Sequence, residues 1–408
     1  MRRTVLTLGV IGLVVTGCGS TDTAEDAPVE ETTGAARPGS DLAAETGSTE
    51  VQGPEPRLVV ADADSGRIDV LDLATEQTVH SFDVENASRL TTINGRYVVA
   101  TDDARARFLD PGSWTIEHGD HSHSYTKGPV DLGVLEGENP AHIIAGDRKV
   151  AVFFDGAGRA DVVDFDALSA GDAAVAATVD TNPHHGIAVP LSDHVVVSTG
   201  GTEEDLPTGL ELRDSAGNPV RALDASCPEM HGEAVFSSYL VVACADGVVK
   251  VDATDDEFST TKFPYPSPDD RAFTFAEGTR GSLVAAPTET GVLMLDTRTG
   301  EWVQARTEGA SLSTGVSSDG KTILSLQADG TFRVFDAVTG AELSSTPVLS
   351  APYDEADPKP SLHVAGTRAY VADPAGSALM EIDYRDSGRV ARTLDFDFTP
   401  ASIGVVGS

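Results

Sequence analysis

The stretch RLVVADADSGRIDVLD, residues 57–72, sets a pattern that the rest of the chain repeats. It contains a strand rich in Val, Arg57-Leu58-Val59-Val60-Ala61, then a Gly-containing turn and a second apolar strand that ends in Asp72. Copies of this signal recur at intervals of 38 to 54 residues. Four short strands in about 40 residues are typical of one β-propeller blade. The copies end at Asp72, Asp110, Asp164, Asp214, Asp252, Asp296, Asp336 and Asp383.

The eight copies predict an eight-bladed β-propeller. No long stretch has the 3.6-residue apolar period of a helix, so the fold is expected to be all-β. The first copy begins directly at Arg57, with no innermost strand before it, whereas the strand-like segment 401–406 at the C-terminus has no blade of its own. We therefore expect one blade to be built from both termini, which pairs the open edges of the sheet.

The N-terminus has the pattern of a bacterial lipoprotein. Arg2 and Arg3 precede the apolar run 6–15, which is too short to span a bilayer, and Val15-Thr16-Gly17-Cys18 follows as a lipobox. Residues 1–17 are expected to be a signal peptide and Cys18 to carry the lipid that holds the chain on the outer face of the membrane. The alternative is an ordinary secretory signal with a chance cysteine.

Composition divides the remainder into two parts. The predicted tether, residues 18–56, contains nine acidic residues between Gly19 and Pro56 but no aromatic one, so it is expected to be disordered. Residues 57–408 form one propeller domain, since no second linker appears. The whole chain has a net charge of −37. This charge argues against nucleic acid as a partner, because binding phosphates requires a basic surface.

Two cysteines remain besides Cys18. Cys227 and Cys244 have sixteen residues between them and would lie in a compartment that permits disulfides. A structural disulfide is the interpretation that their spacing favours. A pair of zinc thiolates is the alternative.

Several histidines occupy equivalent positions in the repeat. When the innermost strands are aligned, four blades carry a histidine near the start of that strand, and such positions surround one mouth of the central channel. Imidazoles that converge there would suit Zn²⁺. The four are His142, His185, His231 and His363, whereas the other blades present Arg89, Thr274, Ser313 and Ser402. His80, His184 and His194 are expected to be structural.

A second cluster lies in a repeat with an insertion, Glu117-His118-Gly119-Asp120-His121-Ser122-His123. His121 and His123 point to the same side of an extended segment and can bind one metal ion. Because the insertion precedes His142, we expect it to fold over the same mouth of the channel. A solvated polar loop is the alternative interpretation.

Together these residues resemble a known family, the periplasmic zinc metallochaperones of the AztD type, which are propellers encoded with zinc-importing ABC transporters. The resemblance spans roughly residue 57 to the end and depends on four segments. They are 118–123, Asn182-Pro183-His184-His185-Gly186, Cys227-Pro228-Glu229-Met230-His231-Gly232-Glu233 and Ser361-Leu362-His363.

The resemblance implies a protein that holds Zn²⁺ and passes it by ligand exchange to the solute-binding protein of the transporter. We expect the protein to be a monomer and not an enzyme. It implies metal binding by the histidines quoted, with His118, Asp120 and Glu233 as outer partners, and a disulfide between the two cysteines. The chain departs from the family in two ways: no histidine occurs between Cys18 and His80, and a lipid anchor replaces free diffusion.

Two other classes of function stay open. Propellers also host lactonases and other hydrolases in the mouth of the channel, and the fold does not decide the function. A zinc hydrolase would need a general base, for which Glu233 is the candidate. A propeller that only binds proteins would need no metal.

Overall fold

The computed structural model describes residues 45–408 except 88, 119, 120, 255, 256, 269, 279, 280 and 357. The predicted signal peptide, the predicted lipidation site Cys18, most of the predicted tether and Asp120 lie outside the described residues. Everything described belongs to one structural unit, Leu42–Ser408. No helix within it is long and apolar enough to cross a membrane.

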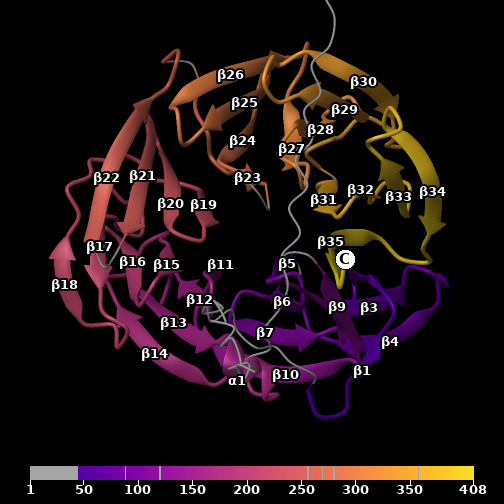
Figure 1. Ribbon diagram of the computed structural model, residues 1–408, viewed down its shortest axis with the longest axis horizontal. Coiled ribbons are helices and arrows are strands. Elements are labelled where there is room, and N and C mark those ends of the chain that lie inside the picture. Colours follow the sequence, from indigo (N-terminus) through magenta and orange to yellow (C-terminus); the bar gives the residue numbers. More distant parts are fainter. Residues whose placement is uncertain are drawn as a thin grey trace, which may run out of the picture. The chain divides into compact units, whose positions relative to one another are not determined.

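Over its described part, the chain forms eight four-stranded antiparallel sheets, one three-stranded sheet and the short helix α1 (Phe165–Ser169). Figure 1 shows the four-stranded sheets arranged in a circle, each with one edge strand toward the centre. The all-β class is thus confirmed, and the arrangement is that of a β-propeller.

The first four sheets, each written from the inner strand outward, follow the chain order. They are β35 (Pro400–Val406), β2 (Arg57–Asp62), β3 (Arg67–Asp72) and β4 (Thr78–Asp83); β5 (Arg89–Ile93), β6 (Tyr97–Thr101), β7 (Arg105–Asp110) and β10 (Val130–Glu136); β11 (Pro140–Ala145), β12 (Lys149–Phe154), β13 (Arg159–Asp164) and β14 (Val175–Asp180); and β15 (Ala188–Leu191), β16 (His194–Thr199), β17 (Gly209–Arg213) and β18 (Pro219–Ala222).

The other four sheets continue around the circle. They are β19 (Glu233–Phe236), β20 (Tyr239–Cys244), β21 (Gly247–Thr254) and β22 (Glu257–Pro264); β23 (Ala276–Glu277), β24 (Leu283–Thr288), β25 (Gly291–Asp296) and β26 (Glu301–Arg306); β27 (Ser311–Val316), β28 (Thr322–Gln327), β29 (Thr331–Asp336) and β30 (Glu342–Pro347); and β31 (Ser361–Ala365), β32 (Arg368–Asp373), β33 (Ala378–Asp383) and β34 (Arg389–Asp395).

The hydrophobic core lies between neighbouring sheets rather than in one central mass. One cluster joins Val59 of β2 to Val98 of β6, and the next joins Val99 of β6 to Val152 of β12. Alternate residues of a strand point to opposite faces of its sheet. The second strand of each sheet is apolar on both faces because it packs against both neighbours, which explains the Val-rich runs that reveal the repeat.

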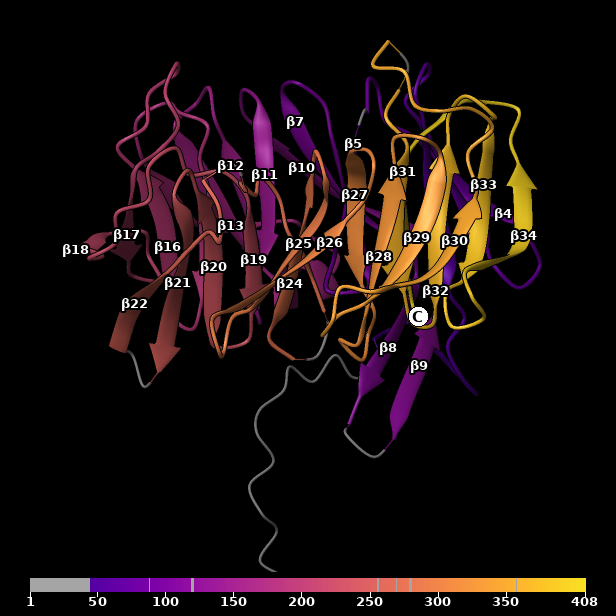
Figure 2. The ribbon, with the colours of Figure 1, turned by 90° about the horizontal axis from the view of Figure 1, so that it is seen from above.

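A separate three-stranded sheet is built from β1 (Thr49–Val51), β9 (Ser122–Thr126) and β8 (Ser113–Glu117). The hairpin β8–β9 follows β7, the third strand of its four-stranded sheet. In an antiparallel sheet the third strand runs in the same direction as the first. The hairpin therefore leaves from the face of the ring at which the inner strands end, and Figure 2 shows β8 and β9 extending beyond that face.

The folded part begins earlier than residue 57, where the sequence placed it. β1 pairs with β9, and the Glu45 carboxylate contacts Arg96 Nη1 at 2.7 Å and Lys127 Nζ at 2.8 Å. Both cations also contact Asp110, which is fully buried. Burying these charges is tolerable only because each is paired. The acidic composition of residues 45–56 suggested disorder because it does not reveal these cationic partners.

Candidate metal centre

Three of the four aligned histidines come together at the mouth of the channel where the inner strands begin. His142 lies in β11, and His185 and His231 lie just before β15 and β19. Their ring centroids are 4.9 Å apart for His142–His185, 5.0 Å for His185–His231 and 6.1 Å for His142–His231. Three consecutive sheets thus each supply one imidazole to a single cluster.

Each of these imidazoles has a partner at its Nδ1 atom. His185 Nδ1 is 2.6 Å from Asp155 Oδ2, and His231 Nδ1 is 2.6 Å from the carbonyl oxygen of Phe273. His142 Nδ1 makes a long hydrogen bond of 3.4 Å to Glu233 Oε1 and lies 3.2 Å from Oε2. Carboxylates and carbonyls only accept hydrogen bonds, so each neutral ring donates from Nδ1 and leaves Nε2 as a bare acceptor.

The Nε2 atoms of His142 and His185 are only 3.2 Å apart. If both rings are neutral, both atoms present lone pairs at this short distance, and the two repel. A positive charge between them, a proton or a metal ion, removes the repulsion. Two nitrogens bound to one tetrahedral Zn²⁺ at 2.0–2.1 Å would be about 3.3 Å apart, which matches the observed distance.

The third imidazole is close to this arrangement without completing it. Rings bound to one tetrahedral zinc ion would have centroids about 5 Å apart. Two of the three pairs have this separation, whereas His142 and His231 are about 1 Å too far apart. Accordingly, no set of three or more His, Cys, Asp or Glu side chains in the described chain already surrounds a metal position. Binding by all three rings requires a small movement of His231.

The electrostatics of the cluster favour a cation. Burial alone would raise the pKa of Glu233, but the neighbouring His142 imidazole lowers it, so the carboxylate stays charged. Burial likewise tends to lower the pKa of His142, and Glu233 raises it above the usual value. At His231 burial dominates and lowers the pKa, which favours the neutral, ligating form.

The cluster faces a cavity of about 570 Å³. Arg89 and Glu277 line it together with the three histidines. Arg89 Nη2 donates to the carbonyl of Ala141, beside His142. Burial, with the negative charge of Glu233, raises the pKa of Glu277 to about 7. The cavity therefore offers carboxylates and imidazoles but little free positive charge.

His363 does not join this cluster, although it occupies the equivalent position in its blade. It lines a different cavity, which shares only Glu277 with the first. Burial lowers the pKa of His363 to about 4, opposed only by a hydrogen bond to the Val405 backbone. The expected convergence of four histidines is thus replaced by three, because β31 lies across the ring from β11 and β15 (Figure 1).

The insertion does not fold over the same mouth either. His118, His121 and His123 lie at the tip of the β8–β9 hairpin, on the face where the inner strands end. The expectation failed because position in the sequence before His142 does not reveal the direction in which β7 points. These three rings form a cluster of their own, with centroids 5.1 to 5.3 Å apart.

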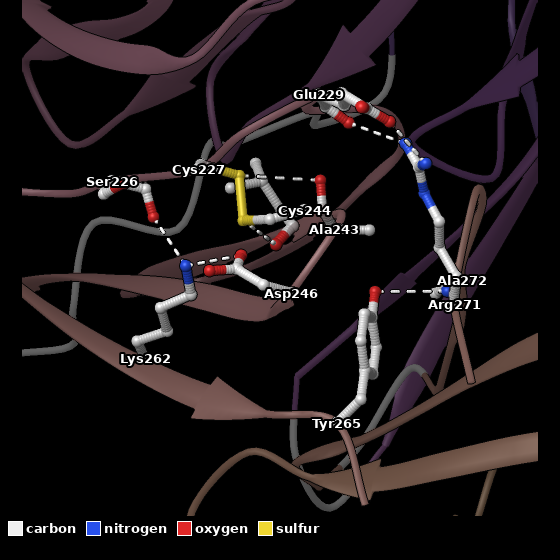
Figure 3. Close-up of a disulfide and its surroundings, with 11 residues drawn as sticks. Ser226, Cys227, Glu229, Ala243, Cys244, Asp246, Lys262, Tyr265, Arg271 and Ala272 are labelled. Carbon is white, nitrogen blue, oxygen red and sulfur yellow. Dashed lines mark hydrogen bonds and ion pairs between the residues drawn. A yellow bond between two sulfur atoms is a disulfide. The ribbon is translucent and has the colours of Figure 1, made fainter. Parts of the chain in front are cut away.

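The predicted disulfide is present. Cys227 and Cys244 are bonded, and Figure 3 shows the bond joining the loop before β19 to the end of β20. The same loop is tied by backbone hydrogen bonds from His231 to Ala243 (3.0 Å) and from Ala245 to Pro228 (2.7 Å). The bond therefore fixes the loop that carries His231, and the zinc-thiolate alternative is excluded.

Asp155 and the carbonyl of Phe273 were not predicted from the sequence. Asp155 follows β12 in the turn between a second and a third strand, as Asp62 ends β2 and Asp373 ends β32. This recurrence made it look like a turn residue. The sequence signal that could have revealed its role was its position, because Asp155 lies in the blade that precedes His185 along the chain. Of the histidines expected to be structural, His184 is buried and contacts Ser198 Oγ at 2.8 Å.

No protein-family model matches the chain. The chain is 25% identical to the zinc chaperone AztD of Citrobacter koseri, over 86% of this chain and 86% of that protein. The chain resembles AztD. A solved structure of apo AztD from the same organism has a TM-score of 0.79 at 22% identity, over 87% of this chain and 98% of that chain.

The structural similarity to AztD can be compared with the similarity to a more distant propeller. The structure of a putative 6-phosphogluconolactonase from Bacteroides uniformis has a TM-score of 0.53 at 14% identity, over 86% of this chain and all of that one. The AztD structure is thus the closer match to this fold.

Proposed function

We propose that this protein is an extracytoplasmic zinc metallochaperone that holds Zn²⁺ at His142, His185 and His231. The observation that carries the proposal is the pair of Nε2 atoms of His142 and His185, 3.2 Å apart with their Nδ1 atoms occupied by carboxylates. A carboxylate on the far nitrogen of a ligating histidine fixes its tautomer and raises its basicity. Asp155 and Glu233 have this role here.

Three histidines suit delivery of zinc as well as storage. Structural zinc sites have four protein ligands, whereas a three-ligand site leaves one coordination position open. An incoming ligand can occupy that position before the donor histidines leave. His185 is about one-third exposed, so a partner can reach it. We propose that the partner is the solute-binding protein of a zinc ABC importer and that the transfer occurs by ligand exchange.

The proposal names zinc because the relative is called a zinc chaperone. Imidazole also suits copper and nickel, and the usual order of affinity places Cu²⁺ above Zn²⁺. Competition between the two ions is therefore part of the test below.

The hydrolase interpretation has less support. It needs Glu233 as a free general base, yet this carboxylate is paired with His142 Nδ1. The relative is named as a chaperone and not as an enzyme. A propeller that only binds proteins would not need the opposed Nε2 atoms. We therefore infer that the protein is not an enzyme.

We also propose export and anchoring through Cys18. The lipobox in the sequence supports this placement. A lipid anchor would hold the chaperone close to a membrane transporter. Mass spectrometry of the membrane-extracted protein tests it, because an unmodified N-terminus at Cys18 would contradict the anchor.

The eight four-stranded sheets support an eight-bladed ring that is closed by both termini. β35 pairs with β2 from Arg57↔Val406 to Asp62↔Pro400, and it also contacts β5 and β31. Deletion of residues 401–408 should therefore lower the thermal unfolding midpoint of the whole domain. An unchanged midpoint would contradict closure.

The function is tested by zinc binding followed by transfer. The purified chain is titrated with Zn²⁺, alone and against Cu²⁺, and the loaded form is mixed with the metal-free solute-binding protein in the presence of a chelator. We expect sub-micromolar binding and transfer that the chelator does not intercept. Failure to bind zinc would overturn the proposal, and esterase or lactonase turnover would favour the hydrolase.

A further inference from the structure

The third imidazole of the metal centre is held differently from the other two. His142 and His185 each have a carboxylate side chain at Nδ1, whereas the acceptor for His231 is the backbone carbonyl of Phe273, at 2.6 Å. A carboxylate can turn with a moving ring, but a backbone carbonyl moves only with its chain segment. Because His231 is also the ring that must move toward the other two, the segment around Phe273 decides whether it keeps its acceptor.

The segment that carries this carbonyl, residues 265–275, joins β22 to β23. Two contacts hold it on its own side. The backbone N–H of Ala272 donates to Tyr265 Oη at 3.1 Å (Figure 3), and Asp270 Oδ1 accepts a hydrogen bond from Gln304 Nε2 of β26 at 3.1 Å. These two contacts fix the segment, but neither of them reaches the loop before β19.

Arg271 links the segment to the loop that carries His231. Arg271 Nη1 is 2.6 Å from Glu229 Oε2, and Nη2 donates to the carbonyl oxygen of Glu229 at 3.1 Å (Figure 3). The guanidinium carbon also lies 4.3 Å from the centroid of the Phe273 ring, which is a cation–π contact. One side chain therefore contacts both the residue that supplies the acceptor and the loop that supplies the ligand.

The backbone beside this contact leaves little freedom. Glu229 has a φ of 49°, in the left-handed region that non-glycine residues rarely adopt, and its carbonyl is the one that Arg271 binds. Gly232 has a φ of 86°, and a Cβ atom there would lie 2.4 Å from the carbonyl oxygen of Phe273. The two loops thus touch directly beside His231, with no room for a side chain between them.

We propose that Arg271 is a positioning residue for the metal centre, and that by holding Glu229 it makes the His231 loop and the Phe273 segment move as one unit. His231 then keeps its Nδ1–H donated to the Phe273 carbonyl while it approaches the other two rings, so Nε2 stays available to the ion. This role rests on the proposed binding of zinc by the three histidines.

The experiment makes two measurements on variants of the full chain. Long-range proton–nitrogen NMR spectra of the metal-free protein report which ring nitrogen of His231 carries the proton, and titration with Zn²⁺ measures the affinity. Arg271→Met removes the contact to Glu229, and Arg271→Lys keeps a charge that can reach its carboxylate. Glu229→Gln weakens the same contact from the other loop.

Arg333→Met is the matched control. Arg333 Nη1 is also 2.6 Å from a carboxylate oxygen, Glu342 Oε2, but this ion pair joins the outer strands β29 and β30. The Arg333 side chain is exposed to nearly the same extent as that of Arg271, 22% against 25%. The control therefore removes a similar ion pair far from the metal centre.

We expect the wild type to carry the proton at Nδ1 of His231, and Arg271→Met and Glu229→Gln to contain a measurable fraction of the Nε2–H tautomer. Zinc affinity should fall by about 5-fold in Arg271→Met, which is the effect that an exposed ion pair can have. Arg271→Lys should lie between the two, because lysine keeps the charge but not both contacts. Arg333→Met should match the wild type in both measurements.

An unchanged tautomer or an unchanged affinity in Arg271→Met would overturn the positioning role, and so would an equal loss of affinity in Arg333→Met. A wild type that binds no zinc would contradict the proposed function instead. In that case the spectra of the metal-free protein would still decide whether Arg271 positions His231.

Discussion

Four histidines occupy equivalent positions in the repeat, but three of them have different surroundings from the fourth. His142, His185 and His231 lie at or just before the start of the inner strands of three consecutive sheets. Their ring centroids are 4.9 to 6.1 Å apart. His363 begins an inner strand on the far side of the ring and lines a separate cavity. Equivalent positions in a repeat place side chains at the same level along the channel and point them in the same direction. The side chains come together only where their blades are also adjacent.

The partners differ as well. Each of the three converging rings has an acceptor at Nδ1, which leaves Nε2 available to a metal ion. His363 is instead kept neutral by burial, with a hydrogen bond to the Val405 backbone. Because His231 also has a backbone partner, the candidate metal ligands are separated from His363 by the carboxylates at His142 and His185 and by the convergence of the three rings.

The largest effect is expected from His142→Ala/His185→Ala. This change removes both opposed Nε2 atoms, so the affinity of the central site for zinc should fall by more than the ~100-fold that loss of an outer partner can cost. Isothermal titration measures it, with His80→Ala on an outer strand as the control. An unchanged affinity would mean that the three rings are no more a metal centre than His363 is.

A smaller loss is expected from Asp155→Ala, because the carboxylate orients His185 without binding the metal itself. Zinc affinity should fall by about 10-fold to 100-fold while the fold persists. Asp373→Ala, at the equivalent turn of a distant sheet, is the matched control for removal of a turn carboxylate. Equal affinities in the two variants would show that Asp155 has only a turn role.

Removal of the disulfide by Cys227→Ala/Cys244→Ala should affect stability more than zinc binding. The bond closes a loop of 17 residues, so its loss should lower the free energy of unfolding by about 3 kcal/mol. The affinity should fall less than in Asp155→Ala, because His231 keeps its bonds to Ala243 and Phe273. Urea unfolding and zinc titration of the same sample measure both. A larger loss of affinity than in Asp155→Ala would show that the loop depends on the bond.

Much of this could be predicted from the sequence, and the failures have a common cause. The Asp-terminated strands reveal the repeat because apolar alternation and turn residues are local, and the three converging histidines follow from aligning it. The position of the hairpin depends on the direction of β7, and the role of Asp155 depends on which neighbouring loop it faces. Neither is local. The isolation of His363 depends on the width of the ring, which no spacing in the sequence encodes.

The smallest effect on zinc binding is expected from His363→Leu, which should leave the affinity unchanged. Its effect should appear in acid instead. With a folded pKa of about 4 against the usual 6.5, His363 binds a proton only in the unfolded chain between these values. The free energy of unfolding of the wild type therefore falls as the pH drops from 6.5 to 4, by at most about 1.4 kcal/mol per pH unit from this group.

In His363→Leu that contribution is absent, so the difference in the free energy of unfolding between variant and wild type should shift in favour of the variant as the pH falls. Urea unfolding of both proteins at several pH values measures the difference, and the acidic residues that they share cancel in it. A difference independent of pH would show that His363 already takes up its proton in the folded protein. A loss of zinc affinity would return it to the metal-binding group.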